Sequence, residues 1–237
     1  MRQLSARSVV LSLLLGAHPP ELPVSALVDA GEMFDIAEPT LRVALTRMVA
    51  AGDLERTDGT YRLSPRLTER QLRQDVALDP PQQGWDSSWE MVVVTSVGRS
   101  AADRAGLRST LAELRLAELR EGVWMRPANL SRTLPTWPQE LISTFLTTPT
   151  HDPAALAAQL WDLAAWDLDG RHLLDDMSRA GSAADRLTVA AAVVRHLRTD
   201  PALPTELVPD SWIAPRLRSA YAGYQQELVA AGMQLQV

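Results

Sequence analysis

The sequence predicts a mixed α+β protein, and three patterns along the chain lead to this fold class. Residues 36–63 join an amphipathic helix to two short strands, and residues 91–146 combine short strand-like runs with one helix. Residues 151–237 show helical periodicity. We therefore expect three successive parts, divided near residues 78 and 150.

The stretch at 36–63 begins with a helix that has one buried face. Apolar residues recur there at helical spacing: Leu41, Leu45, Met48 and Val49. Pro39 suits the first turn of a helix, because its missing N–H is not needed there. Gly52 follows the last periodic residue and is a typical helix stop. The helix is therefore expected to end just before Gly52.

Two short strands are expected after this helix, at residues 54–57 and 60–63. Asp58-Gly59 between them favours a tight hairpin, because glycine adopts positive φ without steric cost. A helix, a stop and a hairpin in this order predict a recognition helix followed by a wing.

Two further helices are expected before this stretch. The first spans residues 5–15 with Leu4, Val9, Leu11, Leu14 and Leu15 facing inward, and the second spans 25–33 with Ser25 as its N-cap. Residues 1–17 also have features of a secretory signal, but Ser8 and Ser12 interrupt the apolar run, and a buried helix is favoured. Three helices and a hairpin predict that residues 1–78 form a winged helix-turn-helix DNA-binding domain.

The predicted DNA contacts lie on the exposed side of the recognition helix and on the wing: Thr40, Arg42, Val43, Thr46, Arg47, Arg56 and Arg62. Arginine pairs bidentately with guanine or clamps a phosphate, and threonine reaches a base edge or a phosphate. Contact with a thymine methyl group would explain Val43 on a solvated face. The alternative is an amphipathic helix whose outer side chains only cover the domain surface.

Residues 79–150 are expected to form a ferredoxin-like middle domain that helps subunits dimerise. After a linker, the expected elements are a strand at 91–97, a helix at 101–116, two strands within 118–126 and a last strand at 141–146. The domain also resembles the small ferredoxin-like nucleases of CRISPR systems, which hold a metal with a carboxylate near the end of the first strand. That strand ends Thr95-Ser96-Val97-Gly98 without an acid, so we expect no nuclease activity.

Residues 151–237 are expected to form a helical C-terminal domain for an effector or for dimerisation. The expected helices span 154–166, 183–198 and 215–231. Acidic residues and a histidine crowd together after the first of them: Asp167, Asp169, His172, Asp175 and Asp176. His172 and Asp176 have a spacing that suits a metal on one helix face, but a solvated acidic turn is the favoured interpretation. We predict no metal site and no cofactor.

Composition limits the function classes. The 237 residues carry a formal net charge of −6, so no global positive field indicates nucleic acid, although a DNA-binding surface is a local feature. The chain contains no cysteine, which excludes disulfide scaffolds, thiolate metal sites and cysteine nucleophiles. No run approaches the ~20 apolar residues of a membrane span. We expect a cytoplasmic protein without membrane contact.

Four stretches of the chain resemble a known family: Ser5-Ala6-Arg7-Ser8, Thr40 to Met48, Trp89 with its strand and Glu121 to Pro127, and Asp200 to Pro204 with Leu207 to Trp212. In this order they resemble the PaaX-type repressors of bacterial phenylacetate catabolism. The resemblance implies a transcriptional repressor that forms a homodimer, binds a palindromic double-stranded DNA operator and is released by an aryl-CoA thioester such as phenylacetyl-CoA. The chain departs from the family at Ala37, where a serine N-cap is common, and along residues 129–153.

Two other functions stay open. The chain could be an enzyme, a CoA-thioester hydrolase or metal-dependent nuclease with a winged-helix docking module, but it has no G-x-S-x-G elbow and the expected catalytic carboxylate is missing. It could also be a winged-helix scaffold for other proteins. We expect a regulator and not an enzyme. The walls of an effector pocket could be formed by Trp124, Trp137, Trp161, Trp166 and Trp212. Its phosphate-binding groups could come from Arg126, Arg171, Arg179 and Arg186. We assign none of these residues to an effector site.

Overall fold

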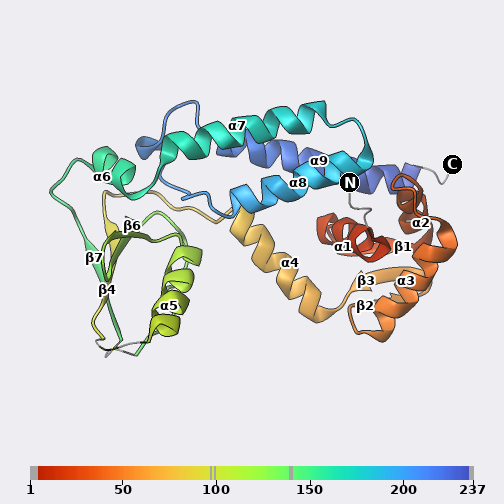
Figure 1. The fold of residues 1–237 in the computed structure, drawn as a ribbon, viewed down its shortest axis with the longest axis horizontal. Helices are drawn as coiled ribbons and strands as arrows, with labels where there is room; N and C mark the ends of the chain where they lie inside the picture. The colour runs from red at the N-terminus through yellow and green to blue at the C-terminus, as the bar shows by residue number, and fades with distance from the viewer. Residues whose placement is uncertain (1–4, 97, 99, 139–140, 235–237) are drawn as a thin grey trace. The chain divides into compact units, whose positions relative to one another are not determined.

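The protein has a mixed α+β fold, which confirms the predicted class (Figure 1). The computed structural model describes residues 5–96, 98, 100–138 and 141–234. The chain divides into two compact units. Unit 1 contains residues 1–78, 172–195 and 215–237, and unit 2 contains residues 79–171 and 196–214. Residues 151–237, which we expected as a separate C-terminal domain, contribute to both units.

Unit 1 begins with four helices and a small sheet. Its elements are α1 (Ala6–Gly16), β1 (Glu21–Pro23), α2 (Val24–Glu32), α3 (Glu38–Ala50), β2 (Leu54–Thr57), β3 (Thr60–Leu63) and α4 (Pro65–Leu78). The strands are antiparallel in the order β1-β3-β2. The two strands of the predicted hairpin are confirmed, and β1 is an additional strand that the sequence did not indicate. At the turn, Asp58 and Gly59 have φ values of 48° and 81°, as a tight hairpin requires.

The helix starts agree with the sequence at α1 and differ at α2. Ser5 caps α1 by accepting a hydrogen bond from the backbone N–H of Ser8 at 3.2 Å. The second helix begins at Val24, after Pro23, and has no side-chain cap. Our expectation that Ser25 is its N-cap is therefore wrong, because Ser25 already lies within the first turn. Leu4, expected to face inward, lies outside the described residues.

The core of unit 1 joins the two ends of the chain. Val9, Val10, Leu13 and Leu14 of α1 are almost fully buried. They belong to one apolar cluster with Leu187 and Ala190 of α8 (Ala183–Leu197) and with Tyr224 and Leu228 of α9 (Ala214–Gln234). The cluster also holds the buried side of α3. The predicted winged-helix region therefore shares its core with helices that follow it by more than one hundred residues.

Unit 2 is built around a four-stranded antiparallel sheet with the order β5-β6-β4-β7. Its elements are β4 (Trp89–Val94), α5 (Ala101–Glu113), β5 (Ala117–Arg120), β6 (Val123–Pro127) and β7 (Ile142–Thr147). Val92 and Trp124 face the cluster under α5, whereas Trp89 and Met125 face a second cluster with Leu156 and Leu203. Each face of the sheet is thus covered in part by apolar side chains.

The helices after the sheet differ from the sequence prediction. We expected one helix at 154–166, but the chain forms α6 (Pro153–Leu160) and α7 (Leu163–Arg179). Trp161 between them is extended, and the Asp162 carboxylate accepts a hydrogen bond from the backbone N–H of Ala165 at 3.0 Å, which favours a new helix start. The acidic stretch from Asp167 to Asp176 lies within α7, so the expected solvated turn is wrong.

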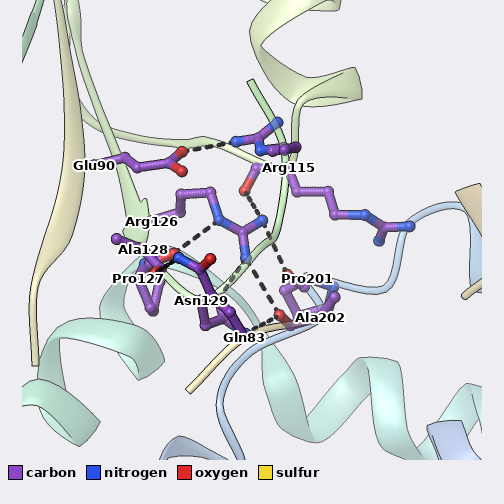
Figure 2. A network of polar contacts seen from close by, with 10 residues as sticks. Gln83, Glu90, Arg115, Arg126, Pro127, Ala128, Asn129, Pro201 and Ala202 are labelled. Carbon is purple, nitrogen blue, oxygen red and sulfur yellow. Dashed lines mark hydrogen bonds and ion pairs between the residues drawn. The ribbon is translucent and has the colours of Figure 1, made fainter. Parts of the chain in front are cut away.

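Arg126 of β6 is fully buried and connects separate segments of unit 2 (Figure 2). Its Nη2 donates to Asn129 Oδ1 at 2.8 Å and to the carbonyl oxygen of Ala202 at 3.2 Å, and its Nε donates to the carbonyl oxygen of Pro127 at 3.0 Å. Burial lowers the pKa of Arg126 to about 9. Its guanidinium is therefore a structural link between β6 and the segment around Ala202, and not a free cation for an effector.

Among the described residues, no helix has both the length and the apolar character that a membrane span requires.

Candidate DNA-binding surface

The exposed face of α3 contains the predicted contact residues. Leu41, Leu45 and Met48 are buried, as expected from their spacing. The five residues predicted to contact DNA from this helix are all exposed: Thr40, Arg42, Val43, Thr46 and Arg47. Half of the Val43 side chain is accessible, which is high for an aliphatic residue. Val49 was expected in the buried stripe, but it lies at the edge of the exposed face and is 36% accessible.

A groove brings part of this face together with the start of α1. Its volume is about 660 Å³, and its lining includes Thr40, Val43 and Arg47 of α3 together with Ser5 and Arg7 at the start of α1. The side chains of Arg42 and Thr46 do not line it. Three of the five predicted helix residues therefore line the groove. Arg7, which precedes them in the chain by 33 residues or more, lines it as well.

Arg42 and Thr46 are engaged within the helix itself. The Nε of Arg42 donates to the Glu38 carboxylate at 2.6 Å, one helical turn earlier. The hydroxyl of Thr46 donates to the backbone carbonyl oxygen of Arg42 at 3.0 Å. Exposed pairs of this kind are weak, so Arg42 can exchange Glu38 for another anion. The Glu38 carboxylate nevertheless places a negative charge beside the exposed face of α3.

The register of the small sheet separates the two predicted wing arginines. Arg56 is paired across the sheet with Tyr61, and Arg62 is paired with Glu55 and Glu21. Because paired residues point to the same side, Arg56 and Arg62 lie on opposite faces of the sheet. Arg62 donates to the Glu21 carboxylate at 3.0 Å, whereas the guanidinium carbon of Arg56 lies 5.7 Å from the centre of the Tyr61 ring. The structure does not bring these two arginines together.

Asp53, which follows α3, forms ion pairs with two more arginines. It is 4% accessible, and its carboxylate accepts hydrogen bonds from Arg7 Nη2 at 2.8 Å and from Arg66 Nη2 at 2.7 Å. The hydrogen bond from Arg7 is the main reason why the pKa of Asp53 lies below its ordinary value, and the charges of both arginines act in the same direction against burial. The side chains of Arg7 and Arg66 are more than half exposed. One buried carboxylate thus holds two cations at the surface.

Sequence reasoning did not identify this cluster as a unit. The spacing of Arg7, Asp53 and Arg66 has no period, and each comes from a different part of the chain. The only sequence signal is a single acid between the helix stop and the apolar start of a strand, which is also a common loop composition.

The aromatic and acidic candidates elsewhere do not gather into one site. Trp124 lies in the cluster under α5, Trp161 packs against the cluster on the other face of the sheet, and Trp166 stacks on Trp212 at 4.7 Å between ring centres. The Asp167 carboxylate accepts hydrogen bonds from Arg171 Nε and from the backbone N–H of Ile213. In the described part of the chain, no three His, Asp or Glu side chains are grouped to hold a metal ion.

Comparison with known proteins identifies the family. A family model described as PaaX-like protein matches residues 5–70, and a model described as the PaaX protein central Cas2-like domain matches residues 82–148. The solved structure of the uncharacterized protein Rv0674 from Mycobacterium tuberculosis is 48% identical to this chain, with a TM-score of 0.90 over 98% of this chain and 99% of that chain. No curated protein matches the chain. The two family models together span more than half of the sequence, in the order that the motifs predict, and the chain belongs to the PaaX-like protein family.

Proposed function

We propose that this chain is a DNA-binding transcriptional repressor whose first 78 residues act as a winged helix-turn-helix. In this proposal α3 enters the major groove, and the hairpin of β2 and β3 serves as the wing. The order of helices and strands supports this interpretation, because three helices precede a hairpin with positive φ at both turn residues. Membership of the PaaX-like family supports a regulatory role.

The observation that carries the proposal is the groove along α3. Thr40, Val43 and Arg47 line it from the helix, and Arg7 lines it from the start of α1. This set combines a hydroxyl, an exposed methyl surface and two guanidinium groups, which are the groups that read base edges and hold phosphates. Among the described residues, no three His, Asp or Glu side chains are grouped to hold the metal ion that the nuclease alternative needs.

The finer parts of the proposal concern assembly and release. We infer that the ferredoxin-like sheet of unit 2 helps two copies pair, so that their recognition helices meet the two halves of a palindromic operator. An aryl-CoA thioester such as phenylacetyl-CoA would then release the operator by changing the spacing of the two helices. Both inferences rest on the family resemblance.

A gel-shift titration tests DNA binding directly. The full chain is titrated against DNA from its own promoter and against a shuffled sequence, at two salt concentrations. We expect retardation that is tighter on the promoter and that weakens as salt rises, because arginine–phosphate contacts release counterions. Equal affinity for both sequences, or no retardation at any concentration, would reject the proposal. A second series with phenylacetyl-CoA tests release, and an unchanged shift would reject the effector.

A further inference from the structure

One flank of α4 carries exposed arginines that lie outside the groove along α3. Leu67, Gln71 and Leu78 form the buried side of this helix, whereas Arg66 and Arg70 are exposed. Residues four apart lie on the same side of a helix, about 6 Å apart along its axis. Arg66 and Arg70 therefore form a short row of cations beside the buried side of α4.

Gln71 fixes the rotation of α4 about its own axis. It is 2% accessible, and its Nε2 donates to the backbone carbonyl oxygens of Leu15 at 2.8 Å and Ala17 at 3.0 Å, at the end of α1. The last carbonyl groups of a helix have no partner within it, so a side chain that reaches them also joins the two helices. Because Gln71 is held to α1, the arginine flank of α4 keeps one orientation relative to α1.

Asp53 connects this flank to the groove along α3. Asp53 and Arg7 both line the groove. One oxygen of the Asp53 carboxylate accepts a hydrogen bond from Arg7, and the other accepts one from Arg66. The two guanidinium groups therefore lie close together, one from the groove and one from the start of α4. Together with Arg70, this group carries three positive charges and one buried negative charge.

The arginines of this row keep donors for an outside partner. Arg66 gives a single nitrogen to Asp53, and its side chain is 68% accessible. No described residue forms a hydrogen bond or an ion pair with the exposed side chain of Arg70. Arg73, one turn further along α4, donates to the Glu69 carboxylate at 3.0 Å. The row of available guanidinium groups therefore ends at Arg70.

We propose that Arg7, Arg66 and Arg70 bind neighbouring phosphate groups of the DNA backbone beside the bases that α3 contacts. This inference rests on the proposed function and extends the DNA-binding surface from α3 onto α4. Each strand of a duplex carries one phosphate per about 3.4 Å of axis, so long side chains spaced by about 6 Å reach successive phosphates. A phosphate contact carries no information about the base sequence, so the row adds affinity without adding specificity.

Arg70→Ala is the decisive variant, because no described residue depends on Arg70 for a hydrogen bond. Fluorescence anisotropy of the full chain with labelled promoter DNA and with a shuffled sequence measures the affinity from low to high salt. We expect about threefold to tenfold weaker binding to both DNAs at low salt. The slope of log affinity against log salt should become shallower by about 0.9, the value for one phosphate. Arg195→Ala removes the same charge from α8, outside the groove and the row, and should keep the wild-type slope.

Arg66→Ala and Arg70→Lys extend the test. Arg66→Ala should give the same changes as Arg70→Ala, and the double variant Arg66→Ala, Arg70→Ala should lose about twice as much of the salt slope. Arg70→Lys keeps a long cationic side chain and should restore most of the wild-type affinity, because a phosphate also binds a point charge. Thermal unfolding checks that each variant is folded before the affinities are compared.

The outcomes separate this inference from the proposed function. If Arg47→Ala weakens promoter binding while Arg66→Ala and Arg70→Ala keep the wild-type salt slope, α3 binds DNA without the row, and only the inference is rejected. An equal change in Arg195→Ala would assign the effect to overall charge and would also reject the inference, as would a loss confined to the promoter. A wild-type protein that binds neither DNA rejects the proposed function and the inference together.

Discussion

Arg126 in unit 2 and Arg47 in unit 1 show two opposite uses of the same side chain. Arg126 is fully buried, and its guanidinium donates to Asn129 and to backbone carbonyl oxygens of its own unit. Arg47 is exposed on α3 and lines the groove, and none of the described residues forms a hydrogen bond or an ion pair with its side chain. A guanidinium has five N–H donors, and Arg126 uses them internally whereas Arg47 leaves them for a partner.

Arg7 and Arg66 lie between these extremes. Each donates to Asp53 through a single nitrogen, and each keeps more than half of its side chain exposed. Exposure alone therefore does not define an arginine that is available for DNA. The number of acceptors that the fold itself supplies to each guanidinium is the better criterion, and it can be tested residue by residue.

The largest effect is expected from Arg126→Ala. The variant loses the hydrogen bonds of the guanidinium, leaves the carbonyl oxygen of Ala202 and the side chain of Asn129 with fewer partners, and opens a cavity. We expect the free energy of unfolding to fall by about 3–5 kcal/mol. Denaturant unfolding measures it, with the exposed Arg120→Ala as control, for which a change below about 0.5 kcal/mol is expected. Similar midpoints for both variants would contradict a structural role for Arg126.

Arg47→Ala should leave stability unchanged and weaken DNA binding. The loss of one base or phosphate contact corresponds to about 1–3 kcal/mol, or roughly fivefold to 150-fold in affinity for the promoter. Fluorescence anisotropy with labelled promoter DNA measures the affinity. Arg195→Ala, an exposed arginine of α8 that does not line the groove, is the matched control. If both variants bind equally well, α3 is not the recognition helix.

Asp53→Asn tests the two arginines, Arg7 and Arg66, that are partly engaged by the fold. Loss of the carboxylate charge weakens two charge-assisted hydrogen bonds, and we expect about 1–2 kcal/mol of lost stability at neutral pH. Because the folded carboxyl has a pKa below the ordinary 3.8, its contribution to stability is complete above that value and disappears as the pH falls through the lower one. Thermal melts from pH 6 to pH 2.5 should therefore show the difference between wild type and variant shrinking below pH 4. A constant difference across this range would rule out the ion pair as its source.

The smallest effect is expected from Glu38→Gln, which releases Arg42 and removes a negative charge from the face of α3. We expect DNA affinity to rise by up to about fivefold at low salt and to return toward the wild-type value at high salt. Glu69→Gln breaks the equivalent pair with Arg73 on α4 and serves as control. An equal gain in both variants would show that overall charge, and not the release of Arg42, is responsible.

Local patterns of the sequence predicted most individual helices and strands, but fewer of the contacts between segments that are distant in the chain. The Asp58-Gly59 turn and the buried spacing of Leu41, Leu45 and Met48 are confirmed, because turn chemistry and helical period depend on neighbouring residues. The break at Trp161 was missed, because apolar spacing continued through it while Asp162 started a new helix.

The candidate site shows the same limit. The exposure of Thr40, Val43 and Arg47 followed from periodicity, but their proximity to Arg7 depends on how α1 packs beside α3. The separation of Arg56 and Arg62 depends on the register of β2 and β3. Because the turn at Asp58-Gly59 fixes this register, pairing the residues outward from the turn would have placed the two arginines on opposite faces. Asp53 and its two partners, Arg7 and Arg66, come from three regions of the chain, and no local pattern joins them.

The shared core of α1, α8 and α9 has a consequence for biosynthesis. Leu13 and Leu14 belong to one buried apolar cluster with Leu228, which is translated more than two hundred residues later. The core of unit 1 therefore cannot form completely during synthesis until α9 has left the ribosome. A recombinant fragment that stops at residue 78 would expose part of this apolar surface to water and would be expected to aggregate, so expression of the proposed DNA-binding region needs α8 and α9 with it.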